Sequence, residues 1–91
     1  MEHDGLTERV SRLRAMGHAV SEWSNGPHVQ YEVHAHPYRK ILVCVAGSIT
    51  FHVASGDRVL AAGDEIDLPP GTPHAATVGP HGVTCIEAAV A

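Results

Sequence analysis

The chain has 91 residues, a formal net charge of −4 at pH 7 and an apolar fraction of 44%. This length allows one small domain, near the lower limit at which a chain buries a sufficient core without disulfides, metal or a partner subunit. The acidic balance, without any basic cluster, argues against nucleic acid and anionic membrane surfaces as partners. No apolar run reaches membrane-spanning length and the first residues lack the features of a signal peptide, so we expect a cytoplasmic protein.

The first predicted element is a short amphipathic helix. Leu6, Val10 and Leu13 recur at helical spacing, and arginines occupy the other faces. We expect this segment, residues 1–17, to pack on the surface of a barrel or to contact a second subunit. Residues 18–91 then form the barrel domain.

Beyond the helix the sequence has the pattern of a β protein. Short alternating runs are separated by turn signals of Gly, Pro, Asn and Asp, and no helical periodicity follows. Many short strands at regular spacing predict an all-β barrel or sandwich. The predicted strands are 18–23, 29–36, 40–45, 48–53, 58–60, 65–68, 74–78 and 83–88, with turns that include Ala46-Gly47 and Gly79-Pro80.

Two histidines, His34 and His36, stand one residue apart in the predicted strand 29–36. Successive side chains of a strand point to opposite faces, so both imidazoles lie on one face and can share a metal ion. A third histidine, His74, follows a stiff turn of prolines and glycine. If the fold brings it to the same point, three imidazoles form a metal site with an open side. Alternatively, the pair lies at a solvated strand edge and His74 bonds a backbone carbonyl.

The same strand has an apolar face that needs a cover. Alternation places Val29, Tyr31 and Val33 on one face, and Glu32 with the histidines on the other. If the histidine face lines a wet pocket, the apolar face points out of the barrel. This stripe and the small size of the domain predict a homodimer.

The two cysteines, Cys44 and Cys85, lie far apart in the sequence, each inside an apolar run typical of a strand. Buried, reduced thiols that pack in the core are therefore expected. The alternatives are a disulfide, or a thiolate that serves as a soft ligand or a redox-sensitive neighbour.

The segment from His34 to Gly47 resembles the first motif of the cupin family, in which an H-x-H pair precedes an acidic residue and then a glycine. The segment from Gly63 to His74 matches the second motif, G-x5-P-x-G-x2-H, at every fixed position. Two ordered motifs at this spacing are specific, and the similarity is to the small single-domain bacterial cupins. The resemblance implies a double-stranded β-helix, a jelly-roll barrel with a central metal site at His34, His36 and His74.

Lys40 departs from this family pattern, because many metal-binding cupins have a glutamate ligand there. Three outcomes are open: the histidines hold the metal alone, Glu32 pairs with Lys40, or the metal is absent and the pocket binds an anion. With Lys40 in the pocket, surplus positive charge favours a small anionic ligand. Alternatively, Lys40 bends to the barrel mouth and is solvated. Tyr38 either donates its hydroxyl into the pocket or covers the mouth.

Two classes of function fit these residues. The first is a metal-dependent enzyme, an oxygenase, isomerase or lyase, that acts on a small anionic organic substrate. The second is a non-catalytic cupin that binds or senses a small molecule or a metal. Imidazole ligands suit Zn, Fe, Ni or Cu better than Mg or Ca, and the sequence does not choose among them. No catalytic residue is assigned at this level.

Overall fold

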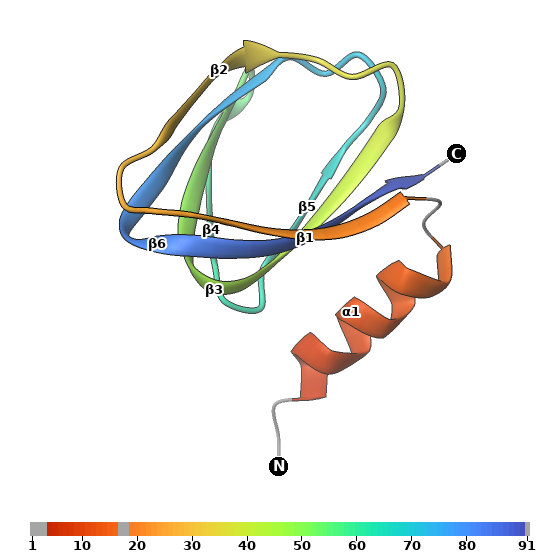
Figure 1. Cartoon of the computed structure of the whole chain (residues 1–91). Coiled ribbons are helices and arrows are strands. Elements are labelled where there is room, and N and C mark those ends of the chain that lie inside the picture. The colour runs from red at the N-terminus through yellow and green to blue at the C-terminus, as the bar shows by residue number, and fades with distance from the viewer. Residues whose placement is uncertain (1–3, 17–18, 91) are drawn as a thin grey trace.

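A computed structural model describes residues 4–16 and 19–90. The helix α1 packs outside a sheet of antiparallel strands that curls into a barrel (Figure 1). The strand order is β1-β6-β3-β4, with β2 added to β6 and β5 added to β3. The prediction of an all-β barrel with one N-terminal helix is confirmed. The elements are α1 (Asp4–Met16), β1 (Ala19–Asn25), β2 (Gln30–His34), β3 (Arg39–Val53), β4 (Gly56–Ala61), β5 (Glu65–Leu68) and β6 (His74–Val90).

Two of the predicted turns are bends inside long strands. The strand β3 continues through Ala46-Gly47, and β6 continues through Gly79-Pro80. The pairing register between the two strands shifts twice, just before Ala46 and just after Gly47. Irregularities of this kind bend a strand without ending it, so β3 and β6 run together through both halves of the barrel. The short predicted strands on either side of each bend therefore merge.

The bend brings the backbones of Gly47 and Gly82 into close contact. Both residues have a positive φ, 72° and 80° respectively. A Cβ atom on Gly47 would lie 2.0 Å from the carbonyl oxygen of Gly82. Only glycine combines this backbone conformation with the space available. The glycine that the sequence assigns to a turn therefore permits this close approach of the two long strands.

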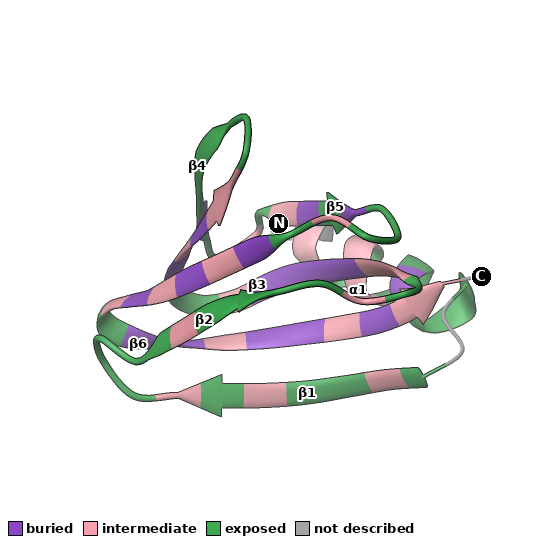
Figure 2. Ribbon diagram, turned by 90° about the horizontal axis from the view of Figure 1, so that it is seen from above, coloured by how far each residue is buried: buried purple, intermediate pink, exposed green. Residues whose placement is uncertain are grey.

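Buried side chains form two clusters on opposite faces of β3 and β6. One cluster fills the barrel, and the other lies beneath the helix, where Leu13 is only 2% exposed. Successive side chains of a strand point to opposite faces, so neighbouring residues of β3 belong to different clusters. Leu42 points into the barrel, and Ile41 points to the helix. Figure 2 shows that burial is concentrated along β3 and β6. This second cluster consists of Leu13 of the helix and of Ile41, Val43, Ile86 and Ala88 of the two strands.

The two cysteines are direct partners in the pairing of β3 with β6. Both thiols are free and buried in the barrel interior. Burial raises the pKa of Cys85 to about 12 and also raises the pKa of Cys44, so both thiols stay protonated near neutral pH. Their separation in the sequence gives no indication of this contact, since antiparallel pairing joins distant segments.

In the part of the chain described above, no helix has the length and apolar character needed to cross a bilayer.

Replacing Gly47 with alanine should lower the free energy of unfolding by about 2 to 4 kcal/mol, because the new methyl group collides with the Gly82 carbonyl in an unfavourable backbone conformation. Gly71 has a similar φ of 76° and a Cβ atom on it meets no atom within 4 Å, so Gly71→Ala is the matched control. Denaturant unfolding measures both variants. Equal stability of the two variants would contradict the close approach.

The thiols of Cys44 and Cys85 should react with Ellman's reagent at least about 100-fold more slowly in the folded protein than in denaturant. Their burial excludes the reagent and their raised pKa values keep the thiolate fraction small. Thiol release followed by absorbance, with and without denaturant, measures the ratio. Labelling of the native protein at the denatured rate would show that the barrel interior is open.

Candidate metal centre

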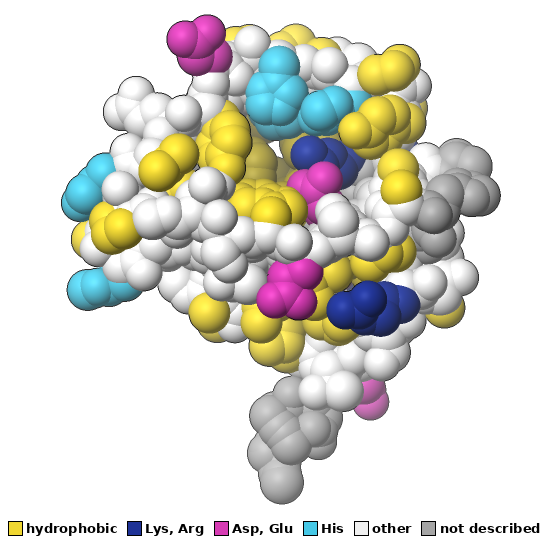
Figure 3. Space-filling view, in the orientation of Figure 1, with side chains coloured by type: hydrophobic (Ala, Val, Ile, Leu, Met, Phe, Trp, Pro, Cys, Tyr) yellow, Lys and Arg dark blue, Asp and Glu magenta, His cyan; other side chains and the backbone are white. Residues whose placement is uncertain are grey.

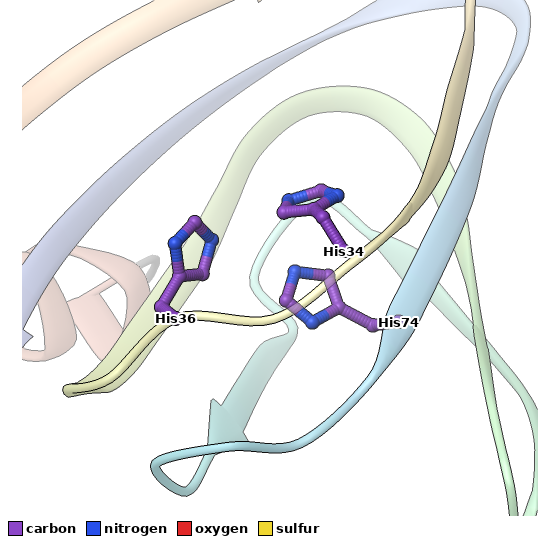
Figure 4. A group of neighbouring side chains, drawn as sticks. All are labelled: His34, His36 and His74. Atoms are coloured by element: carbon purple, nitrogen blue, oxygen red, sulfur yellow. The ribbon is translucent and has the colours of Figure 1, made fainter.

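The three histidines His34, His36 and His74 come together at one end of the barrel (Figure 4). His34 ends β2 and pairs directly with His74, the first residue of β6. His36 follows in the loop after β2. The ring centroids are 4.3 Å apart for His34 and His74, 4.9 Å for His34 and His36, and 5.4 Å for His36 and His74. One nitrogen of each ring lies within 4.8 Å of the other two, so the three side chains are close enough to converge on one metal ion.

Backbone carbonyls set the orientation of two of these rings. The Nδ1 atom of His34 lies 2.8 Å from the carbonyl oxygen of Glu32, and Nδ1 of His74 lies 2.9 Å from that of Thr72. A ring nitrogen that donates to a carbonyl carries the proton, which leaves the lone pair on Nε2 in the neutral ring. In the third ring, the Nε2 atom of His36 is buried without a hydrogen-bond partner in the described residues. A divalent ion fits this donor set, because it would satisfy the orphaned nitrogen.

The surroundings of the site favour the neutral form of the imidazoles. Burial lowers the pKa of His36 and of His74, and the positive charge of Lys40 lowers both further. The neutral ring is the form that binds metals, since a protonated ring has no free lone pair. These two rings therefore stay competent for binding at a pH below the usual range of histidine.

A β-bulge in β2 decides which side chains accompany His34. The register pairs Tyr31 with Ala76 and His34 with His74, so three steps along β2 match two steps along β6. The extra residue reverses the alternation, and Tyr31 and His34 both face the barrel interior. Glu32 is exposed and does not line the interior. Strict alternation along the sequence predicts the opposite placement of Tyr31 and Glu32.

A cavity of about 230 Å³ opens beside the histidines. Figure 3 shows this hollow with histidines at its rim, a hydrophobic floor, and one basic and one acidic side chain facing into it. Most of the wall is apolar, as is usual for sites that bind small organic molecules. The wall is lined by the aliphatic side chains of Leu42 and Ile49, the aromatic ones of Trp23, Tyr31 and Phe51, of which Tyr31 carries a hydroxyl, and the polar ones of His34, His74, Lys40 and Glu87.

Lys40 lies in this cavity and pairs with Glu87 rather than with Glu32. Its Nζ atom is 3.2 Å from Oε1 of Glu87, and the same oxygen accepts a hydrogen bond from Nε1 of Trp23 at 2.7 Å. The Lys40 and Glu87 side chains are only 14% and 22% exposed. The ion pair cancels the surplus positive charge that Lys40 alone would bring. Lys40 is therefore not a source of net positive charge that would attract an anion.

Three lining residues of the cavity were not predicted from the sequence: Glu87, Trp23 and Tyr31. Glu87 is the one carboxylate in the apolar last strand, and it shares a face with Cys85. A single charge on the inward face of an apolar strand could have indicated a pocket residue. Trp23 reaches the cavity because β1 pairs Trp23 with Cys85, a register that the sequence does not reveal. Tyr38 stacks on the ring of His36, with centroids 5.1 Å apart, and does not line the cavity.

Comparison with known proteins places this site in a family. A family model described as a cupin domain matches residues 22–84, more than half of the chain. The chain belongs to the cupin domain family. The predicted membership and the predicted double-stranded β-helix are thereby confirmed, and all three clustered histidines lie within the matched segment of the cupin. No curated protein matches the chain.

Several solved structures are similar to this cupin. A chain from the crystal structures of the DMSP lyases RdDddP and RnDddQII has a TM-score of 0.74 and 25% identity over 79% of this chain. A cupin-like protein from Thermotoga maritima has a TM-score of 0.71 and 23% identity over 78%. The polyketide cyclase RemF from Streptomyces resistomycificus has a TM-score of 0.71 and 20% identity over 79%. The cupin spans only 37%, 55% and 53% of these three chains.

The Lys40–Glu87 pair generates a stability prediction. Glu87→Leu should lower the free energy of unfolding by about 2 to 3 kcal/mol, because it leaves the mostly buried ammonium of Lys40 unpaired. The double variant Lys40→Met/Glu87→Leu should recover most of this loss, since apolar side chains can replace a buried pair. Denaturant unfolding of the single and double variants measures the coupling.

The exposed pair of Arg39 and Asp67 supplies the control, because both side chains are more than 40% exposed. Asp67→Leu should change the stability by less than about 1 kcal/mol. Additive effects of the Lys40 and Glu87 substitutions would contradict the contact between them.

Proposed function

We propose that this cupin holds one divalent transition-metal ion through the Nε2 atoms of His34, His36 and His74. The observation that carries the proposal is the buried Nε2 atom of His36, which has no hydrogen-bond partner in the described part of the chain. A buried polar atom without a partner is costly, and a metal ion would remove that cost. The backbone carbonyls that hold His34 and His74 would also reduce the entropy lost on binding. Zn, Fe, Ni and Cu suit three imidazoles.

The metal would be open to an additional ligand. Among the described residues, no fourth His, Cys, Asp or Glu joins the group of three histidines. Structural metal sites normally have four protein ligands, whereas sites that act on a substrate keep a position open. The adjacent cavity gives room for a small organic molecule, and its apolar walls would exclude water from it. A bound divalent ion supplies Lewis-acid polarisation of a ligand oxygen.

We infer that the ligand is a small organic anion and that the protein is a metal-dependent enzyme. Three neutral imidazoles leave the charge of a dication uncompensated, so a negatively charged oxygen is the preferred additional ligand. The similarity to a DMSP lyase chain at 25% identity supports an enzyme of the oxygenase, isomerase or lyase classes. The specific lyase reaction is not transferred, because the cupin covers 37% of that chain.

A non-catalytic binding or sensor protein is the second candidate. It is favoured by Lys40, which stands where many metal-binding cupins have a glutamate ligand and which is already engaged by Glu87. Mass spectrometry of a bound ligand after prolonged incubation separates the two candidates. A ligand that is recovered unchanged supports the binding protein, and a converted one supports the enzyme.

The expected homodimer belongs to the same proposal. After the bulge in β2, the apolar stripe predicted from the sequence is reduced to Val29 and Val33, which are 36% and 69% exposed. A second copy of the chain that covers these side chains would remove them from water.

His34→Ala and His36→Ala should each weaken zinc binding by more than about 100-fold, since loss of a direct ligand exceeds the 10- to 100-fold effect of a supporting residue. His74→Ala should do the same, but His74 is buried and its loss can also affect folding. Elemental analysis and competition with a chelating dye measure the affinity. His81→Ala, at an exposed position outside the group, is the control. Wild-type protein that contains no metal after expression with added metal would refute the proposal.

A further inference from the structure

The pair of Lys40 and Glu87 forms a charged patch in a cavity wall that is otherwise mostly apolar. We propose that this patch binds a hydroxyl group, so that the preferred ligand is a short aliphatic hydroxycarboxylate. Its carboxylate would face the histidines, its hydroxyl would contact the patch, and its hydrocarbon would lie against the wall. The proposal rests on the proposed metal function for the carboxylate end only.

The patch has both a free acceptor and free donors. Oxygen Oε1 of Glu87 is occupied by Nζ of Lys40 and by Nε1 of Trp23. The other oxygen, Oε2, accepts no hydrogen bond from the residues that the structure describes. An ammonium group has three N–H donors, and Glu87 is the one partner found for Lys40 in the same part of the chain. A hydroxyl group can donate to Oε2 and accept from Nζ at the same time.

The charge of the patch selects against ionised groups. A second carboxylate would be attracted by Lys40 but repelled by the free oxygen of Glu87. An ammonium group would be attracted by Glu87 but repelled by Lys40. Both would lose hydration in a cavity whose apolar walls strengthen each repulsion. A neutral hydroxyl forms both hydrogen bonds without bringing a charge, so the patch favours it.

The remaining wall explains why the rest of the ligand is hydrocarbon. Leu42, Ile49 and Phe51 line the cavity and are each at most 4% exposed, and they offer no polar side-chain atom. A polyhydroxylated ligand such as a sugar would leave hydroxyl groups unpaired against these side chains. A short methylene chain between the carboxylate and the hydroxyl would bury apolar surface instead.

The test measures binding of matched carboxylates to the zinc-loaded protein by calorimetry. The probes are β-hydroxypropionate, butyrate, β-alanine and succinate, together with the same four end groups on a chain one methylene longer. At the chain length that fits the cavity better, the hydroxycarboxylate should bind about 10-fold more tightly than the carboxylate that ends in a methyl group. It should also bind more tightly than the amino acid and the dicarboxylate of the same length. Trp23 is the only tryptophan of the chain and donates to Glu87, so its emission gives a second readout.

Two variants should shift the relative affinities in opposite directions. Glu87→Gln leaves the charge of Lys40 unbalanced, so the diacid should gain at least about 5-fold relative to the hydroxy compound. Lys40→Met leaves the charge of Glu87 unbalanced, so the amine should gain similarly. Glu22→Gln, at an exposed position in β1, should leave the order unchanged.

The outcomes separate this inference from the metal proposal. Protein that retains zinc and binds the hydroxy and methyl compounds equally overturns the hydroxyl site and leaves the metal proposal intact. Charge variants that leave the relative affinities of the diacid, the amine and the hydroxy compound unchanged overturn it as well. Protein that binds no zinc overturns the proposed function itself, whatever the order of the ligands.

Discussion

The pairing of β3 with β6 is the interaction on which the rest of the molecule depends. These two strands run side by side through both halves of the barrel, and every other strand pairs with one of them. Their inner faces supply most of the core, and their outer faces supply the surface on which α1 packs. Lys40 and Glu87 also lie on this pair of strands, so the same contact that folds the barrel builds the charged patch of its cavity.

Local irregularities in the strands place the functional side chains. The bulge in β2 turns Tyr31 and His34 to the same face, although they are three residues apart. The bends near Gly47 and Gly82 allow β3 and β6 to turn a corner while remaining paired. A regular strand would send every second side chain to the outside. The site therefore depends on departures from regular strand geometry as much as on the strands themselves.

The sequence predicted the elements that follow from local patterns. The helix, the all-β barrel and the convergence of His34, His36 and His74 could be anticipated from periodicity, turn signals and the spacing of two motifs. The place of Glu87 could not, because it depends on how β1, β3 and β6 align across the sheet. The bulge in β2 could not be predicted either, because the alternating sequence of this strand does not show that one of its residues has no partner in β6. The position of Glu87 and the bulge in β2 are both determined by the pairing of strands that are distant in the sequence, and not by local sequence preferences.

The pair of Lys40 and Glu87 changes the electrostatic effect of a lysine at the position where many metal-binding cupins have a glutamate ligand. A glutamate ligand would cancel one charge of a bound dication, whereas three neutral imidazoles cancel none. Lys40 would add a repulsive charge beside the metal, but Glu87 offsets it at 3.2 Å, and the indole of Trp23 holds Glu87 in place. The Lys40–Glu87 pair is thus neutral overall, and a divalent ion held by the three histidines would keep its full positive charge. The negative charge that balances such an ion would then come from the ligand, and this links the missing carboxylate to the anionic ligand that we propose.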